Sequence, residues 1–308
     1  MKCAGKYNLK GIILSNSEYG SGISRLEGAV NSARLLQKEL GDGVELWINE
    51  DSAAAKEKIR KYLSYEVFSE RDVFLFYFCG HGDVAGKGYD ELILECKDTT
   101  SDNYADGTGI EYEWLIKIIK QKVATRYVII LDCCKSGLVS AMGAKEISLD
   151  VHSLETGSHA AIITSTSTVD ASIEMSIRGK LYAAFTYFMA QSLKEGIAGK
   201  GEYLQLNDLF LEVKRRVIEH NSRESIPYLP APQIKNVGLI NQVDLFRNRV
   251  NEQGEGGTRE EKKTKNVIRE GPSEYKYSLR GGFSDLYDHS GDDSKNGHLI
   301  KGGFNDIL

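Results

Sequence analysis

Apolar residues in this chain follow two patterns, short runs rich in β-branched and aromatic residues and longer stretches with helical spacing. Runs of about four to eight such residues, bounded by Gly or polar residues, indicate buried strands. Gly11–Ser15, Val44–Ile48 and Ala160–Ser165 have this form. From Leu26 to Leu40 apolar residues recur at helical spacing, and Gly41 is placed to end that helix. The alternation of strand and helix predicts an α/β fold built on a mostly parallel sheet with right-handed crossovers.

Four further segments have the apolar positions of helices: Ala53–Leu63, Glu111–Lys122, Leu181–Leu193 and Leu206–Ile218. Asp, Ser and Asn side chains commonly accept the first N–H groups of a helix. We therefore expect Asp51 or Ser52 to cap the first of these helices and Asn207 to cap the last. Residues 88–98 are expected to form a hairpin.

Two of the apolar runs end abruptly at a reactive residue. The third strand, which begins near Val73, runs into Cys79-Gly80-His81-Gly82, and a later strand that begins at Arg126 runs into Asp132-Cys133-Cys134-Lys-Ser-Gly. Ligands of open α/β sheets bind outside the carboxyl ends of the strands. If these two strands are neighbours, His81 and Cys134 meet at that edge.

An imidazole beside a thiol is a nucleophilic arrangement. A thiol with a pKa of about 8.5 is only partly ionised at neutral pH, and an adjacent imidazole can take its proton and later protonate a leaving amine. Glycines flank His81, and Ser136-Gly137 follows Cys134. Because glycine lets backbone N–H groups approach a substrate, we expect the region of Gly82 and Cys134 to stabilise an oxyanion.

These two motifs resemble the signatures of the caspase-like cysteine peptidases, and most of all those of the metacaspases and their bacterial relatives. The resemblance covers about residues 8–247 and makes Cys134 the nucleophile, with Cys133 as a neighbour and His81 as general base and acid. It implies a three-layer sandwich with a mostly parallel six-stranded sheet and helices on both faces. The helix that follows the first strand in this family often carries Ala-x-Asn-Asp-Ala, and this chain has Ser32 in place of the Asp.

The resemblance also bears on specificity. Metacaspases carry an Asp two residues before the nucleophile, here Asp132, which lines a pocket for an Arg or Lys before the cut bond. We expect Asp170 to assist it from the opposite wall. Caspases that cut after Asp carry Arg in that pocket, and Arg25 lies in roughly the matching region. The alternative for Asp132 is a helix-capping or strand-end carboxylate.

Calcium activation is a further implication of the resemblance. Metacaspases often place activating carboxylates between the two catalytic strands, and Asp98, Glu111 and Glu113 fall near those positions. Carboxylate oxygens are the ligands that Ca²⁺ prefers. The family's further acid shortly after the nucleophile is absent from residues 135–145, and acidic loops are commonly solvated surface. No cofactor is expected in the bond cleavage itself.

The composition limits the partners, the structural sites and the cellular compartment that we expect for this chain. The chain has 308 residues, a net charge of −5 and five cysteines without Cys-x-x-Cys spacing. The charge argues against nucleic acid as a partner, and the cysteines argue against a disulfide framework or a zinc site. No apolar stretch reaches the roughly 18 residues of a membrane helix, and the first residues do not read as a signal peptide, so we expect a cytoplasmic protein with no membrane partner.

The composition changes near Val250. We predict a peptidase domain over 1–248 and a Gly-rich linker and tail over 249–308, in which Arg280-Gly-Gly-Phe and Lys301-Gly-Gly-Phe repeat one unit. Either repeat could occupy the cleft of the enzyme as inhibitor or self-cleavage site, or could dock a partner. The family is often cut between its fourth and fifth strands, which makes Lys145 another candidate site of autoprocessing.

The leading interpretation is therefore a cysteine endopeptidase acting on protein substrates after a basic residue, and the resemblance implies regulation in bacterial defence or cell death. One alternative is an Asp-specific peptidase. Another is a non-catalytic module that keeps the fold and recruits partners through the tail. A flavodoxin-like nucleotide binder is disfavoured because no Gly-rich phosphate loop with the required spacing follows the first strand.

Overall fold

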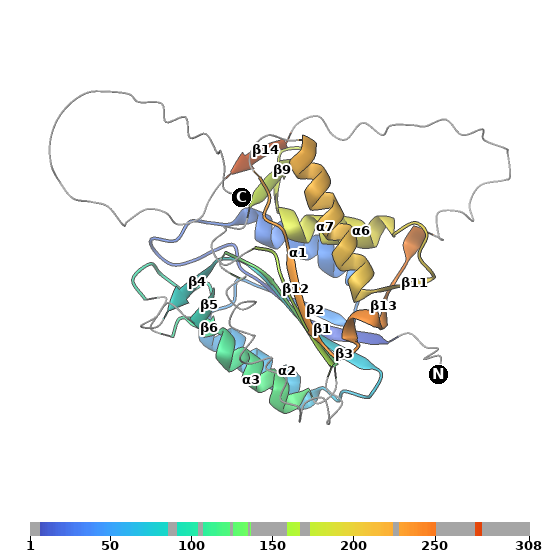
Figure 1. Ribbon diagram of the computed structural model, residues 1–308. Coiled ribbons are helices and arrows are strands. Elements are labelled where there is room, and N and C mark those ends of the chain that lie inside the picture. Colours follow the sequence, from blue (N-terminus) through green and yellow to red (C-terminus); the bar gives the residue numbers. More distant parts are fainter. Residues whose placement is uncertain are drawn as a thin grey trace, which may run out of the picture.

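A six-stranded sheet forms the centre of the molecule (Figure 1). The computed structural model describes residues 7–85, 91–103, 107–123, 126–134, 136, 159–166, 173–223, 228–250 and 275–278. The strand order is β12-β8-β7-β3-β1-β2, and only β12 runs antiparallel to its neighbour. The strands are β1 (Asn8–Ser15), β2 (Val44–Ile48), β3 (Asp72–Cys79), β7 (Arg126–Asp132), β8 (His159–Thr164) and β12 (Gln233–Val237).

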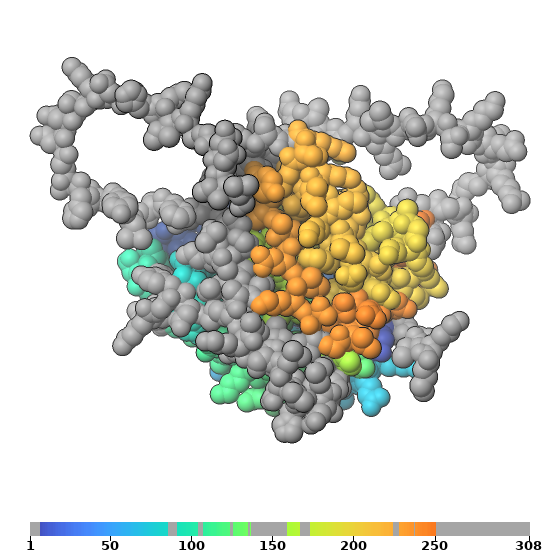
Figure 2. Space-filling view, viewed as in Figure 1, coloured from blue at the N-terminus to red at the C-terminus, as the bar shows by residue number. Residues whose placement is uncertain are grey.

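Helices cover both faces of this sheet, which confirms the expected three-layer α/β sandwich (Figure 1). Helices α1 (Glu27–Leu40), α6 (Ala184–Glu195) and α7 (Leu206–Arg223) lie on one face, and α2 (Ser52–Tyr65) and α3 (Tyr112–Lys122) on the other. Figure 2 shows α7 and the segment through β12 and β13 (gold to orange) on one side of the surface. No helix in the described part of the chain is long and apolar enough to cross a membrane.

Strand β3 contributes to the two hydrophobic cores that flank the central sheet. Its residues are buried along the whole strand. Val73, Leu75 and Tyr77 belong to the core under α1 and α6, whereas the alternate residues Phe74 and Phe76 belong to the core under α2 and α3. Successive side chains of a strand point to opposite faces, so a strand buried on both faces must be continuously apolar. Burial of each such side chain contributes about 1.5–3 kcal/mol, which fixes β3 at the centre of the sheet.

Three smaller sheets lie in the described part of the chain. One has the order β4-β5-β6, with β4 (Gly82–Ala85), β5 (Glu91–Glu95) and β6 (Gly109–Glu111). The second has the order β10-β9-β14, with β9 (Glu174–Ile177), β10 (Lys180–Ala183) and β14 (Tyr275–Ser278). The third joins β11 (Tyr203–Gln205) to β13 (Asp244–Arg247), which follows the short 3₁₀ helix η1 (Ile240–Gln242). The hairpin expected within 88–98 is wrong, because residues 91–95 form one strand whose partners β4 and β6 lie outside that range.

The predicted helix starts were wrong in two places. The helix expected from Leu181 begins at Ala184, because residues 180–183 pair with β9 as a strand. The helix expected from Glu111 begins one residue later, because Glu111 pairs with β5.

The predicted caps were wrong as well. No side-chain cap bond is made by Asp51, and the first N–H of α2, that of Ser52, instead donates to Asp98 at 2.7 Å. Asn207 lies inside α7, and it is Asp208 that accepts the N–H of Gln205 at 3.0 Å. A helix N–H needs an acceptor but does not require that the acceptor be near in the sequence.

Candidate active site

The two reactive residues follow neighbouring strands. β3 and β7 are parallel, with Cys79 opposite Asp132 at their carboxyl ends, and the Gly80 N–H donates to the Asp132 carbonyl at 3.2 Å. His81 and Cys134 each lie two residues beyond this last pair. Adjacent strands are about 4.8 Å apart, so the register places the imidazole and the thiol at the same edge of the sheet.

The His81 ring is held by a backbone carbonyl. Its Nε2 lies 2.9 Å from the Ser24 oxygen, and since a carbonyl can only accept, Nε2 must carry the proton. In the neutral ring the lone pair is then on Nδ1, which is left to accept a proton. Burial lowers the pKa of His81, and the bond to Ser24 opposes this shift only in part. The imidazole is therefore neutral at pH 7, the state that a general base requires.

Tyr19 is a site residue that the sequence analysis did not identify. Its ring packs 4.8 Å from the His81 ring, between centroids, and its hydroxyl accepts the His81 N–H at 2.9 Å while donating to the Asn16 carbonyl at 2.7 Å. An aromatic residue in a Gly-rich turn after β1 was the available signal, because β1 neighbours β3 and ends at the same edge.

The adjacent cysteines differ in exposure. Cys133 is completely buried, whereas Cys134 is partly exposed. Burial raises the pKa of Cys133 well above its usual range, which keeps that thiol protonated and unreactive. Of the two, only Cys134 can meet a substrate.

Gly82 packs against the turn that carries Cys134. A Cβ at this position would lie 2.9 Å from the Cys133 Sγ and 3.0 Å from the Cys134 carbonyl oxygen, closer than side chains tolerate. Glycine is thus required for the backbone after His81 to approach the backbone of the cysteine pair.

The comparisons agree with this geometry. A family model described as the caspase domain of peptidase family C14 matches residues 10–237. The chain belongs to the caspase-domain peptidases. It is therefore a cysteine endopeptidase that acts on protein substrates. Its fold is similar to that in the crystal structure of Caspase-1 from Spodoptera frugiperda, with 15% sequence identity, a TM-score of 0.52, and coverage of 80% of this chain and 92% of that chain. No curated protein matches the sequence.

In this caspase domain Asp132 makes the contacts of a helix cap. It is buried, and its Oδ2 accepts the Thr186 N–H at 3.2 Å and the Thr186 hydroxyl at 2.5 Å in the first turn of α6. Burial raises the pKa of Asp132, and the two bonds from Thr186 oppose the shift. The helix-capping role considered from sequence is thus present in the structure.

Asp132 also lines a small cavity of about 20 Å³ together with Ser165, Thr166, Ile173 and other side chains. This volume holds about one water molecule. An Arg or Lys side chain could enter only if the walls of the caspase domain moved apart. Asp170 lies outside the described residues.

Arg25 follows Ser24, the residue that binds His81, and has an exposed side chain. Its guanidinium lies 3.6 Å from Glu18 and 3.8 Å from Glu27. The structure therefore places Arg25 near the rim of the site, bound loosely to two carboxylates.

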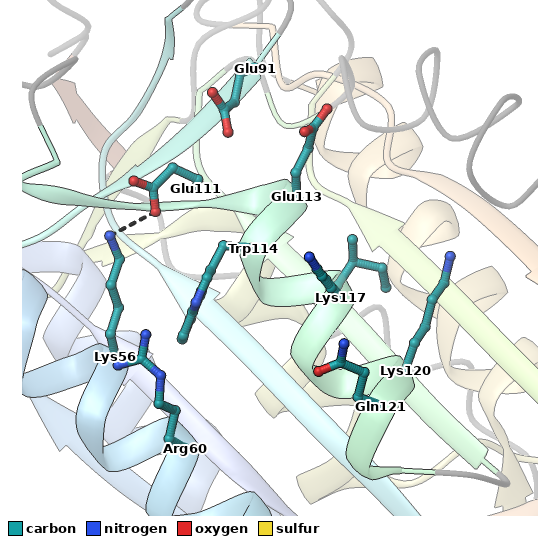
Figure 3. A pocket seen from close by; sticks show the side chains of 10 residues that line it. Lys56, Arg60, Glu91, Glu111, Glu113, Trp114, Lys117, Lys120 and Gln121 are labelled. Atoms are coloured by element: carbon teal, nitrogen blue, oxygen red, sulfur yellow. Dashed lines mark ion pairs between the residues drawn. The ribbon is translucent and has the colours of Figure 1, made fainter.

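The three carboxylates named for calcium do not form one site. Asp98 uses both oxygens for Ser52, at 2.7 Å and 2.8 Å, and Glu111 pairs with Lys56 at 2.7 Å. Figure 3 shows Glu111 directed at Lys56, while Glu113 projects from the start of α3. Among the described residues, no group of three or more His, Cys, Asp or Glu side chains could hold a metal ion. These residues do not fit calcium, because Asp98 and Glu111 have other partners and the three carboxylates do not form one group.

Three candidates for self-cleavage, Lys145, Arg280 and Lys301, lie outside the described residues.

Proposed function

We propose that Cys134 and His81 form the catalytic dyad of this peptidase. The observation that carries the proposal is the common position of both residues two steps beyond the last register pair of β3 and β7. The bond from His81 Nε2 to Ser24 supports it further, because it leaves Nδ1 as the proton acceptor.

In this proposal His81 takes the Cys134 proton, and the thiolate sulfur adds to the carbonyl carbon of the substrate. N–H groups around Gly82 and Cys134 stabilise the oxyanion. The C–N bond then breaks, His81 protonates the departing amine, and water hydrolyses the thioester to release the carboxylate.

We assign Asp132 the recognition of an Arg or Lys before the cut bond. Its buried carboxylate already binds donors from Thr186, and burial without a cation raises its pKa. A guanidinium or ammonium would restore the charged form through a charge-assisted hydrogen bond. An Asp side chain would instead meet like charge. Arg25 supports the alternative, Asp-specific activity, since it lies beside Ser24 at the rim.

The dyad is tested by a matched pair of variants. Cys134→Ala and Cys133→Ala remove the same atom from adjacent residues, and fluorogenic peptides ending in Arg, Lys or Asp report activity. We expect Cys134→Ala to lower kcat/KM at least about 10³-fold and Cys133→Ala to retain activity with lower stability. The reverse pattern, or equal loss in both variants, would contradict the assignment.

Iodoacetamide labelling gives an independent reading. In the folded protein Cys134 should react and the buried Cys79, Cys96 and Cys133 should not.

Cleavage after Asp that survives in Asp132→Asn would reject the basic specificity and favour Arg25. A chain that cleaves no peptide in any condition would favour a non-catalytic binding module.

A further inference from the structure

The strand β14 comes from the tail and pairs with the peptidase domain. Tyr275–Ser278 run antiparallel to β9, with Tyr275 opposite Ile177 and Ser278 opposite Glu174. Figure 1 shows β14 (red) beside β9. β10 pairs with the other edge of β9, so the tail supplies the partner of its outer edge.

The β9–β10 hairpin is a preformed template for such a strand. Its turn residues Arg178 and Gly179 have φ of 51° and 77°, as the twist of a two-residue hairpin turn requires. Helix α1 fixes the hairpin through three bonds. The Asn31 side chain donates to Leu181 O at 3.0 Å, the Ser32 hydroxyl donates to Ala183 O at 3.3 Å, and the Gly28 N–H donates to Glu174 Oε1. An edge already ordered in this way costs little entropy when a peptide pairs with it.

The direction of β14 leads to the reaction site. The last paired residue, Ser278, is opposite Glu174, and the next residue on the β9 side is Ile173. Ile173 lines the cavity of Asp132, and its carbonyl is held by the Ala184 N–H at 2.9 Å. A peptide bound to β9 in the same direction as β14 therefore leaves the edge of β9 beside the Asp132 cavity.

A basic residue follows the paired segment closely in the sequence. Arg280 follows Ser278 by two residues and begins the first Arg-Gly-Gly-Phe unit. An extended chain advances about 3.3 Å per residue, so Arg280 has a reach of about 7 Å beyond the last pair. Asp132 is the carboxylate to which we have assigned recognition of such a residue.

We propose that the outer edge of β9 binds an extended peptide strand with a basic residue two positions beyond the paired segment, and that the chain's own residues 275–281 are its occupant. The inference rests on the proposed function, since it presents the Arg280–Gly281 bond to Cys134. The thiolate adds to the Arg280 carbonyl carbon, the bond to the Gly281 nitrogen breaks with a proton from His81, and one water hydrolyses the thioester. The tail is thereby substrate and competitive inhibitor in cis.

Self-cleavage of the purified full chain tests this assignment by intact-mass spectrometry. We expect a fragment that ends at Arg280, formed at a rate independent of protein concentration. Arg280→Gln should abolish it, and the matched variant Lys301→Gln should leave it unchanged. Equal dependence on both residues, a cut elsewhere only, or a rate proportional to protein concentration would overturn the assignment.

Strand pairing is tested by Lys276→Pro and Tyr277→Pro. Adjacent residues of an antiparallel strand direct their N–H groups to opposite sides, so one of the two prolines must remove a donor to β9. That variant should cut itself about tenfold more slowly or less and still hydrolyse short Arg peptides. Unchanged self-cleavage in both variants would reject docking on β9.

A measurement without catalysis separates this inference from the proposed function. In the Cys134→Ala chain, amide hydrogen exchange of residues 174–177 should be faster in the presence of the proline that removes a donor to β9, because the protecting strand is weakened. Equal exchange overturns docking even if peptide hydrolysis is intact. Faster exchange together with no Cys134-dependent hydrolysis would uphold docking and reject the proposed chemistry, including the cut at Arg280.

Discussion

The Tyr19 hydroxyl accepts the backbone N–H of His81 at 2.9 Å while its ring packs on the imidazole. The same hydroxyl donates to Asn16 O at 2.7 Å, so one side chain ties the residue that carries the imidazole to the end of β1. The orientation of His81 thus depends on a residue in the segment that follows another strand.

Tyr19→Phe should leave the buried His81 N–H without an acceptor. We expect a loss of about 1–3 kcal/mol in the free energy of unfolding and about a tenfold fall in kcat/KM. Chemical denaturation and peptide hydrolysis measure the two effects. Tyr65→Phe is the control, since Tyr65 is exposed. Equal stability and activity in both variants would contradict a role for the Tyr19 hydroxyl.

The lowered pKa of His81 predicts how activity depends on pH. The base is lost only as pH falls through a pKa below the ordinary value of 6.5, so the acid limb of kcat/KM should have its midpoint below 6.5. A midpoint at or above that value would show that burial does not control this imidazole.

The same shift predicts a stability change. Below about pH 6.5 the unfolded chain binds a proton that folded His81 resists, so stability falls as pH drops from there to the lowered pKa. Between about pH 7.5 and about pH 5, the melting temperature of the wild type should therefore fall by more than that of His81→Gln. Parallel losses in the two proteins would exclude His81 as the source.

Asp132→Asn keeps an acceptor for Thr186 and removes the charge. We expect the fold to persist and cleavage after Arg or Lys to fall about 10²-fold or more, because a buried cation would lose its partner. Thr186→Val is the control, since it removes the hydroxyl bound to Asp132 and keeps the charge. The control should be less stable yet retain its preference for basic residues. Loss of that preference in the control alone would assign recognition to Thr186 instead.

Asp98→Ala should lower the free energy of unfolding by about 1 kcal/mol, because Ser52 at the start of α2 loses its acceptor. Asp51→Ala is the matched control, since Asp51 precedes the same helix and makes no cap bond. The difference between the two variants should be the same with and without Ca²⁺. Calcium stabilisation that disappears only in Asp98→Ala would instead indicate a metal ligand.

Much of the fold was predictable because its signals are local. The continuous apolar run of β3 requires burial on both faces, and the helical spacing from Leu26 to Leu40 requires one buried face. The position of His81 and Cys134 at one edge of the sheet was predictable too, since each follows such a run and neighbouring parallel strands end at one edge.

The partners of three helix starts were not predictable. Glu174 accepts from α1, Asp98 from α2 and Asp132 from α6, each from a distant part of the sequence. Helix N–H groups attract a carboxylate through their partial positive charge, and that attraction depends on proximity in space alone. Asp98, considered as a calcium ligand, and Asp132, considered as a pocket residue, both accept N–H groups at helix starts in the structure.

The sequence by itself determined the α/β alternation, the central buried strand and the placement of His81 and Cys134 just after strand ends, because the spacing of apolar residues and the ends of apolar runs are properties of consecutive residues. Only the tertiary structure decided which cysteine is exposed, which ring packs on His81 and which edge the tail strand joins. Each of these depends on contacts between residues far apart in the chain, which form only when the sheet has brought them together.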